Sequence, residues 1–496
     1  MQGKALLAGA IAVSSSVFMC VQDTTNANVS IPSIAGDLGA SPNQGTLVIT
    51  AFAVANAIAM PLTGWLAQRV GQVKLFVASL LLFVFASAAC GSATSLEALI
   101  FARAVQGAVA APLLPMSQSL MLSIFPREKA GIGMSAWSTT ALVAPVLGPI
   151  LGGWISEDYA WPWIFYINVP VGLAAAWAAW MLLRDRETPT RRSPVDLVGL
   201  SLLVIWVGSL QIMLDTGREH DWFGSPFIVG LAITAAVGLI YFIAWELTDP
   251  HPVVDLRLFR RRSFAMGTIA LSIGHGAFFG NMVVLPLWLQ TQLGYSPSQA
   301  GMVLAPIGLF AVFLAPLVGR GVQRVDARWF PTLAFLVFAG VLYLRSLYTA
   351  SVDTWHLLLP SYVQGIAMAT YFAPLTLISL SGVPPERMPA AAGLSNFIRT
   401  LGLGFGTSIA TTVWSVRATV HHAQLVENAS DYSPQFGRGI ETLEDAGLAT
   451  TQAYGAFERM LSLQAGVLGA NDVFRITAIL FLALLVLVWL ARPSKG

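Results

Sequence analysis

The sequence predicts an all-α polytopic membrane protein with fourteen transmembrane helices, on the grounds of its composition and its hydropathy pattern. Hydrophobic residues make up 56% of the 496 positions and charged residues 10%, whereas a soluble protein carries roughly 25% charged residues. The apolar residues form runs of about 18 residues or more, long enough to cross about 30 Å of hydrocarbon. Because these runs are too long for barrel strands, each is expected to be a helix that satisfies its own backbone hydrogen bonds.

The apolar runs follow one another along the whole chain. We expect the first to be a retained span rather than a secretion signal, because no small-residue cleavage site follows it. Cys20 and Cys90 lie in or beside apolar segments and indicate no disulfide framework. We place the fourteen spans at residues 5–32, 45–68, 74–93, 97–122, 131–156, 162–183, 196–214, 226–247, 263–289, 299–319, 329–348, 355–380, 390–415 and 474–491.

The distribution of basic residues predicts the orientation of the spans, since cytoplasmic loops are enriched in lysine and arginine. With the N-terminus inside, the cytoplasmic segments hold Lys4, Arg69, Lys74, Arg127, Lys129, Arg184, Arg186, Arg191, Arg192, Arg257, Arg260, Arg261, Arg262, Arg320, Arg324, Arg328, Arg387, Arg492 and Lys495, out of 27 lysines and arginines in the chain. This bias requires an even number of spans and predicts that both termini are cytoplasmic.

An internal repeat predicts two homologous six-helix bundles. Residues 41–70 align without gaps to residues 296–325 with ten identities in thirty, and Val-Gln-Gly at 105–107 recurs at 363–365. Spans seven and eight would then be inserted between the halves. We therefore divide the chain into an N-terminal bundle at 1–190, the inserted helix pair at 191–255 and a C-terminal bundle at 256–496. Repeats of this kind form a substrate path at their interface.

One long segment, residues 417–472, interrupts this pattern and is predicted to be a periplasmic loop. It contains seven acidic residues and three arginines, and its second half, 440–466, has helix-like periodicity. Loops of this length without a role are uncommon.

No pattern of enzyme or cofactor chemistry is found in the sequence. It has no Gly-Lys-Ser/Thr loop for phosphate, and no His, Cys and carboxylate cluster has the spacing of metal ligands. The net charge of +2 indicates no nucleic-acid partner. We therefore expect no cofactor, no metal and no enzymatic activity, and an ion gradient as the energy source of any transport.

The segment 64–74 after span two resembles the loop signature of the major facilitator superfamily, in which basic residues form a cytoplasmic gate. Gln68, Gln72 and Val73 depart from that signature, so its charge relay is in doubt here, and positive-inside topology is the alternative explanation. The residues that fit the gate are Gly64, Arg69, Gly71 and Lys74.

Two charged residues inside predicted spans are candidates for proton coupling. Arg103 in span four, followed by Gln106, resembles the family's arginine motif; a buried arginine is a functional-site hypothesis, with backbone-bonded structural arginine as the alternative. Asp23 in span one belongs to a segment that resembles the Asp-x-Thr-x-x-Asn signature of fourteen-span drug:proton antiporters. The alternative is that the helix ends near Gln22 and leaves Asp23 at the outer surface.

Span five resembles the antiporter motif that marks exporters within the superfamily. Its small residues at spacings of four would allow close approach of another helix, and its prolines would kink it. Ala144 replaces the usual first glycine. The motif residues are Pro145, Gly148, Pro149, Gly152 and Gly153.

The stretches 208–223 and 163–172 and the pair His421-His422 resemble the EmrB subgroup of this family (the EmrB/QacA type) over essentially the whole chain. The resemblance implies a major facilitator fold of two six-helix bundles plus two inserted helices, and a proton-coupled multidrug efflux antiporter of the bacterial inner membrane. It also implies hydrophobic substrates, a periplasmic EmrA-like adaptor and a TolC-like outer-membrane channel, in contact with membrane lipid.

His275 in span nine is a third candidate for proton coupling, because its imidazole can titrate near neutral pH; a packing role is the alternative. We expect the polar residues Asn26, Asn28, Gln106, Asn281 and Gln364 to face the cavity. Rival functions are an exporter of one metabolite or fatty acid, a nutrient symporter or uniporter, and a membrane-anchored sensor or scaffold that works through its periplasmic loop.

Overall fold

The computed structural model is helical throughout the part of the chain that it describes, which comprises residues 3–40, 42–126, 129–190, 196–217, 220–250, 252, 254–295, 297–322, 324–427 and 434–491. The first half contains α1 (Gly3–Asp37), α2 (Pro42–Ala59), α3 (Thr63–Val70), α4 (Gln72–Gly91), α5 (Leu96–Ala110), α6 (Leu113–Ile124), α7 (Ala130–Asp158), α8 (Trp163–Tyr166) and α9 (Asn168–Leu183). The inserted pair and the second half contain α10 (Leu197–Thr216), α11 (Pro226–Thr248), α12 (Arg262–Gln292), α13 (Pro297–Gly321), α14 (Trp329–Arg345), α15 (Thr354–Leu380), α16 (Met388–Glu427), α17 (Pro434–Asp445) and α18 (Thr450–Leu490).

These helices form the fourteen predicted spans. Eleven spans within the described residues are long and apolar enough to cross a membrane, and α14 is a shorter apolar helix. The 29-residue α7 and the 40-residue α16 complete the bundle. Three spans consist of two helices each, namely α2 with α3, α5 with α6, and α8 with α9. Pro61 and Pro112 lie at two of these breaks, where the missing proline N–H interrupts the helical hydrogen bonds.

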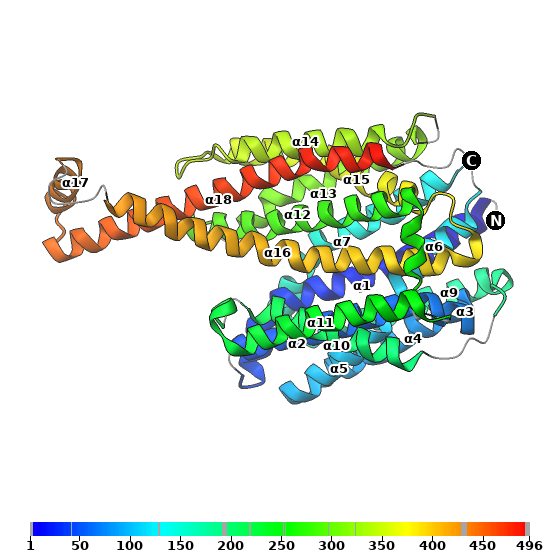
Figure 1. The fold of residues 1–496 in the computed structure, drawn as a ribbon. Helices are drawn as coiled ribbons and strands as arrows, with labels where there is room; N and C mark the ends of the chain where they lie inside the picture. The colour runs from blue at the N-terminus through cyan, green and yellow to red at the C-terminus, as the bar shows by residue number, and fades with distance from the viewer. Residues whose placement is uncertain are drawn as a thin grey trace.

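The helices lie roughly parallel in two bundles, one built by α1–α9 and the other by α12–α18 (Figure 1). Helices α10 and α11 pack against each other, and α10 also contacts α2 of the first bundle and α16 of the second. The inserted pair therefore bridges the two bundles on one side. The chain begins in α1 and ends in α18 at the same end of the molecule, which we call the termini end (Figure 1).

The predicted loop 417–472 is largely helical, in line with the helix-like periodicity of its second half, because the helices of spans thirteen and fourteen continue beyond the predicted ends of the spans. Helix α16 continues to Glu427 and α18 begins at Thr450. The 40 residues of α16 span about 60 Å, twice the hydrocarbon thickness. Together with α17, the far parts of both helices project beyond the bundle, opposite the termini end (Figure 1). We call residues 417–427, 434–445 and 450–472 the helical hairpin.

Ion pairs join the two long helices of the helical hairpin. Arg417 Nε lies 2.6 Å from Asp472 Oδ2, and His421 Nε2 lies 2.8 Å from the same oxygen. Farther out, His422 Nε2 lies 2.7 Å from Glu458 Oε1. These contacts hold α16 and α18 together where they leave the bundle, which explains why a polar segment forms helices here.

The two bundles are in contact at the termini end. Asn396 of α16 donates a 2.6 Å hydrogen bond to Gln118 of α6. Trp137 of α7 stacks on Phe372 of α15, with ring centroids 5.5 Å apart. Helix α7 also packs against α13. The bundles are thus closed against each other on the side where the chain begins and ends.

Candidate functional site

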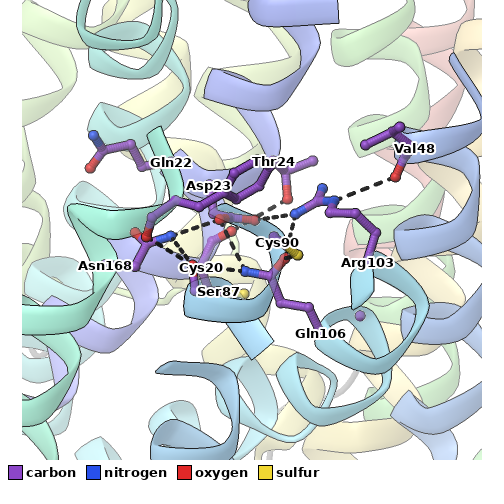
Figure 2. Close-up of polar contacts among 12 residues, drawn as sticks. Cys20, Gln22, Asp23, Thr24, Val48, Ser87, Cys90, Arg103, Gln106 and Asn168 are labelled. Atoms are coloured by element: carbon purple, nitrogen blue, oxygen red, sulfur yellow. Dashed lines mark hydrogen bonds and ion pairs between the residues drawn. The ribbon is translucent and has the colours of Figure 1, made fainter. Parts of the chain in front are cut away.

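A buried polar cluster surrounds Asp23 in the first bundle (Figure 2). Asp23 lies on α1, Ser87 on α4, Arg103 and Gln106 on α5, and Asn168 on α9. Arg103 Nη1 lies 2.5 Å from Asp23 Oδ2, and neither side chain is exposed to solvent. Asp23 Oδ1 accepts hydrogen bonds from Asn168 at 2.7 Å and from Gln106 at 3.1 Å. Four helices therefore converge on one carboxylate, and α1 continues well past Gln22.

Aromatic rings and one backbone carbonyl complete the surroundings of Arg103. Its guanidinium lies 4.3 Å from the ring centroid of Phe52 and 5.6 Å from that of Phe165. Nη1 also donates to Gln106 at 2.7 Å, and Nε to the carbonyl of Val48 at 3.4 Å. The ion pair has no net charge, and breaking a buried pair leaves a strongly unfavourable lone charge. A proton on Asp23 and an intact ion pair with Arg103 are thus competing states.

Small residues of α7 allow close packing against α1 next to this cluster. A Cβ at Gly148 would lie 2.8 Å from Cβ of Thr25, and one at Gly152 would lie 2.9 Å from Cα of Asn26. Asn26 is fully buried, and its side-chain amide has no partner among the described residues. Gly153 is half-buried. The side chains of three other predicted site residues, Asn28, Pro145 and Pro149, lie outside the described part of the structure.

The predicted gate segment lies where the two bundles meet. A Cβ at Gly64 would lie 2.6 Å from Cα of Ala390 on α16, so a larger residue would force the bundles apart. Arg69 lies with its guanidinium 5.2 Å from the ring centroid of Trp65. Its partner here is therefore an aromatic ring of its own helix.

Glu187 anchors the turn between α3 and α4, a role that the sequence did not reveal. Its carboxylate accepts hydrogen bonds from the backbone N–H of Val73 at 3.1 Å and of Lys74 at 2.9 Å. An anion is favourable at a helix N-terminus. Gly71 has a φ of 99°, and a Cβ there would overlap this carboxylate. Gln68, at the position where the family signature has an acid, lines a cavity of about 490 Å³ at the termini end.

The candidate residues of the second bundle do not join the Asp23 cluster. His275 of α12 lies with its ring centroid 4.5 Å from that of Phe279, and its Nδ1 has no partner within the described chain. Asn281 donates to the carbonyl of Ala277 on its own helix. Gln364 is 1% exposed. Of the expected cavity residues whose side chains are described, Gln106 is the one with a hydrogen bond to Asp23.

Two members of the cluster, Ser87 and Asn168, were missed from the sequence. Asn168 also donates to Ser87 Oγ at 2.9 Å and so orders both groups around Asp23. The available signal was weak, since each is a single uncharged polar residue in an apolar span. Their common feature is burial at a position that faces α1.

Comparison with known proteins agrees with the fold and the motifs. The sequence pattern of the Major Facilitator Superfamily matches residues 13–407. Multidrug export protein EmrB of Escherichia coli K12 is 48% identical over 497 residues, which cover 100% of this chain and 97% of that protein. Fatty acid resistance protein FarB of Neisseria gonorrhoeae is 45% identical, over 99% of this chain and 97% of the relative.

A solved structure has the same fold at much lower sequence identity. The crystal structure of the human organic anion transporter MFSD10 matches with a TM-score of 0.61 and 13% identity, covering 98% of this chain and all of that one. The fold, the motifs and the full-length identity to EmrB lead to one assignment: the chain is a polytopic member of the Major Facilitator Superfamily and belongs to its EmrB subgroup.

Proposed function

We propose that this protein is a proton-driven exporter of hydrophobic compounds in the inner membrane, with the termini end in the cytoplasm. The observation that carries the proposal is the fully buried ion pair between Asp23 and Arg103. A membrane anchor or scaffold has no use for a pair that is costly to bury. The names of the relatives EmrB and FarB support export of several drugs and, as the second candidate, export of fatty acids.

The ion pair gives a simple coupling scheme. When the bundles are closed at the cytoplasmic end, as here, a proton that arrives from the periplasm neutralises Asp23 and releases Arg103. Loss of the 2.5 Å contact frees α1 and α5 to move relative to each other. In the inward-facing state the proton leaves to the more alkaline cytoplasm, and the ion pair forms again. Substrate moves out as the proton moves in.

The contacts at the termini end would form the cytoplasmic gate. Because Gly64 has no side chain, α3 can approach Ala390 of α16 closely, and this approach would close the gate. Glu187 fixes the start of α4, so that α3 and α4 move together. Arg69 and Lys74 add positive charge on the cytoplasmic face. His275, buried at a distance from the ion pair in the second bundle, is kept as an alternative proton carrier.

The helical hairpin is proposed to bind a periplasmic EmrA-like adaptor, which would connect the protein to a TolC-like outer-membrane channel. Phe436 of α17 packs on Tyr454 and Phe457 of α18, with ring centroids 5.7 and 5.0 Å apart, so α17 is in contact with α18 at the tip. Tyr454 and Met460 are exposed there. Removing 434–445 should lower resistance in cells and leave transport in purified vesicles intact; equal losses in both would contradict docking.

The test of the proposed function is gradient-driven accumulation in inverted vesicles. Asp23→Asn cannot release a proton, so the variant is expected to bind substrate and to lose accumulation under an imposed pH gradient. The matched control is Asp37→Asn, because Asp37 is an exposed residue near the end of the same helix and should transport normally. Accumulation by Asp23→Asn at the wild-type level would remove Asp23 from the mechanism.

A further inference from the structure

A second intramembrane arginine, Arg399 of α16, lies where the two bundles meet. It is 7% exposed. Its Nη2 donates a 2.7 Å hydrogen bond to Asn396 Oδ1, and its guanidinium lies 4.9 Å from the ring centroid of Phe372. Among the described residues no carboxylate forms an ion pair with Arg399, in contrast to Arg103. Arg399 is thus a nearly buried cation whose partners are neutral.

Both bundles supply the surroundings of this arginine. Asn396, which holds Arg399, also bonds to Gln118 of the first bundle. Phe372, on which the guanidinium stacks, is itself stacked on Trp137 of the first bundle with an interplanar angle of 14°. His275 also lies near Phe372, with ring centroids 6.1 Å apart, and its Nδ1 is unpartnered within the described chain. Hydrogen-bonding groups and aromatic surface therefore occur together at the interface.

An intramembrane guanidinium without a counter-ion is unfavourable, and an anion that reaches it would relieve this. The planar guanidinium matches the two oxygens of a carboxylate in a bidentate contact. Phe372 and Trp137 are buried against each other while the bundles are closed, so separation of the bundles would expose their rings for apolar contact with the body of the same molecule. We infer that Arg399 binds the acidic group of a transported hydrophobic organic anion, with the body of that molecule against Phe372 and Trp137.

This inference rests on the proposed export function, because it names a substrate class for that path. It gives the proton and the substrate separate binding sites. Asp23 and Arg103 bind the proton in the first bundle, and Arg399 binds the substrate anion at the interface. Because Asn396 bonds to Gln118 when the termini end is closed, separation of the bundles breaks this hydrogen bond and frees the Asn396 side chain that holds Arg399. The inward-facing state would then leave Arg399 freer to accept a carboxylate from the cytoplasm.

The test is equilibrium binding to the purified full-length protein in lipid nanodiscs. The probes are a naphthalene carboxylate and its uncharged primary amide, which match in size and shape. We expect Arg399→Gln to weaken carboxylate binding by about tenfold or more and to leave amide binding within about twofold of wild type. Arg399→Lys should recover part of the carboxylate affinity, because it keeps the charge but lacks the planar fork.

Binding and transport of the amide distinguish a failure of the proposed anion site from a failure of the proposed export function. Retained amide binding shows that Arg399→Gln is folded, and Arg399→Lys serves if the glutamine variant does not fold. Equal weakening of both probes, or unchanged carboxylate binding, would overturn the anion site. Proton-driven accumulation of the amide by wild-type vesicles tests the export function separately, since that transport does not require Arg399 to bind an anion.

Discussion

The two bundles carry corresponding polar positions but differ in their charges. Residues 41–70 recur at an offset of 255 and Val-Gln-Gly at an offset of 258; at the offset of 258, Asp23, Ser87, Arg103 and Gln106 correspond to Asn281, Arg345, Ser361 and Gln364. The offset also relates helix starts, since Leu96 of α5 corresponds to Thr354 of α15. The second bundle therefore retains the arginine on the neighbouring helix and replaces the carboxylate with an amide.

Because an amide replaces the carboxylate, only the cluster of the first bundle contains a carboxyl group, and the charge of the second cluster does not change with protonation. Arg345 is 1% exposed and donates a 3.0 Å hydrogen bond to Ser361, so serine and arginine have traded places relative to Ser87 and Arg103. Among the described residues Arg345 has no carboxylate partner. A proton can therefore change the charge state of the first cluster through Asp23, whereas the second holds one permanent positive charge. The comparison teaches that the internal symmetry of the fold does not extend to the charged residues inside the two bundles.

The largest expected effect comes from removing each arginine in turn. Arg103→Met leaves the buried Asp23 carboxylate without its ion-pair partner and should lower the free energy of unfolding by about 3–5 kcal/mol. Arg345→Met leaves neutral hydrogen-bonding groups and should lower it by about 1–3 kcal/mol. Denaturant titration of both variants in detergent measures the difference.

A double variant tests whether the unpaired carboxylate of Asp23 causes the loss of stability in Arg103→Met. Adding Asp23→Asn to Arg103→Met removes the lone carboxylate and should restore most of the lost stability. If Arg345→Met is as unstable as Arg103→Met, or if the double variant is not rescued, the ion pair does not distinguish the two bundles.

The next effect concerns transport and compares Asp23 with its counterpart Asn281. Asn281 bonds through Nδ2 to the carbonyl of Ala277, four residues earlier on its own helix. Asn281→Ala should therefore reduce gradient-driven accumulation by less than about twofold, while Asp23→Asn abolishes it. The two variants are compared in one vesicle preparation at matched protein levels. A loss with Asn281→Ala as deep as with Asp23→Asn would assign coupling to both bundles.

Much of the fold and three of the five residues of the first cluster could be predicted from the sequence. The fourteen spans follow from hydropathy because lipid requires long apolar helices. Asp23, Arg103 and Gln106 were identified because two of them are charged inside apolar runs and all three match family motifs. Ser87 and Asn168 were not identified because a single uncharged polar residue is common in such helices. Its hydrogen-bond partner depends on how each helix is oriented about its own axis in the bundle.

Other features depend on tertiary contacts that hydropathy does not encode. The helical hairpin was read as a loop because its residues are polar, whereas contacts such as Arg417 with Asp472 stabilise helices outside the membrane. Glu187 is 113 residues from Lys74 in sequence, yet it binds the backbone there. Arg399 was not singled out from the sequence, because its lack of a carboxylate partner is visible only once the bundles are packed.

The smallest expected effect compares the helix caps at corresponding positions. Ser95 caps α5 by accepting from the N–H of Ala98, and Asp353, 258 residues later, caps α15 by accepting from the N–H of His356. The hydrogen bond from the His356 N–H holds the pKa of the Asp353 carboxyl below its ordinary value of 3.8. The cap of the second bundle is therefore charged at neutral pH, and the cap of the first is not.

A lowered folded pKa means that the stabilisation from Asp353 is fully present above pH 3.8 and is lost as the pH falls through the folded value. Hydrogen exchange of the first turn of α15 should therefore lose protection in acid, after correction for intrinsic exchange rates. The first turn of α5, capped by Ser95, should keep its protection over the same range. Asp353→Ser retains a capping oxygen without a charge, so it should make α15 behave like α5. A pH-dependent loss that survives in Asp353→Ser would place the titrating group elsewhere.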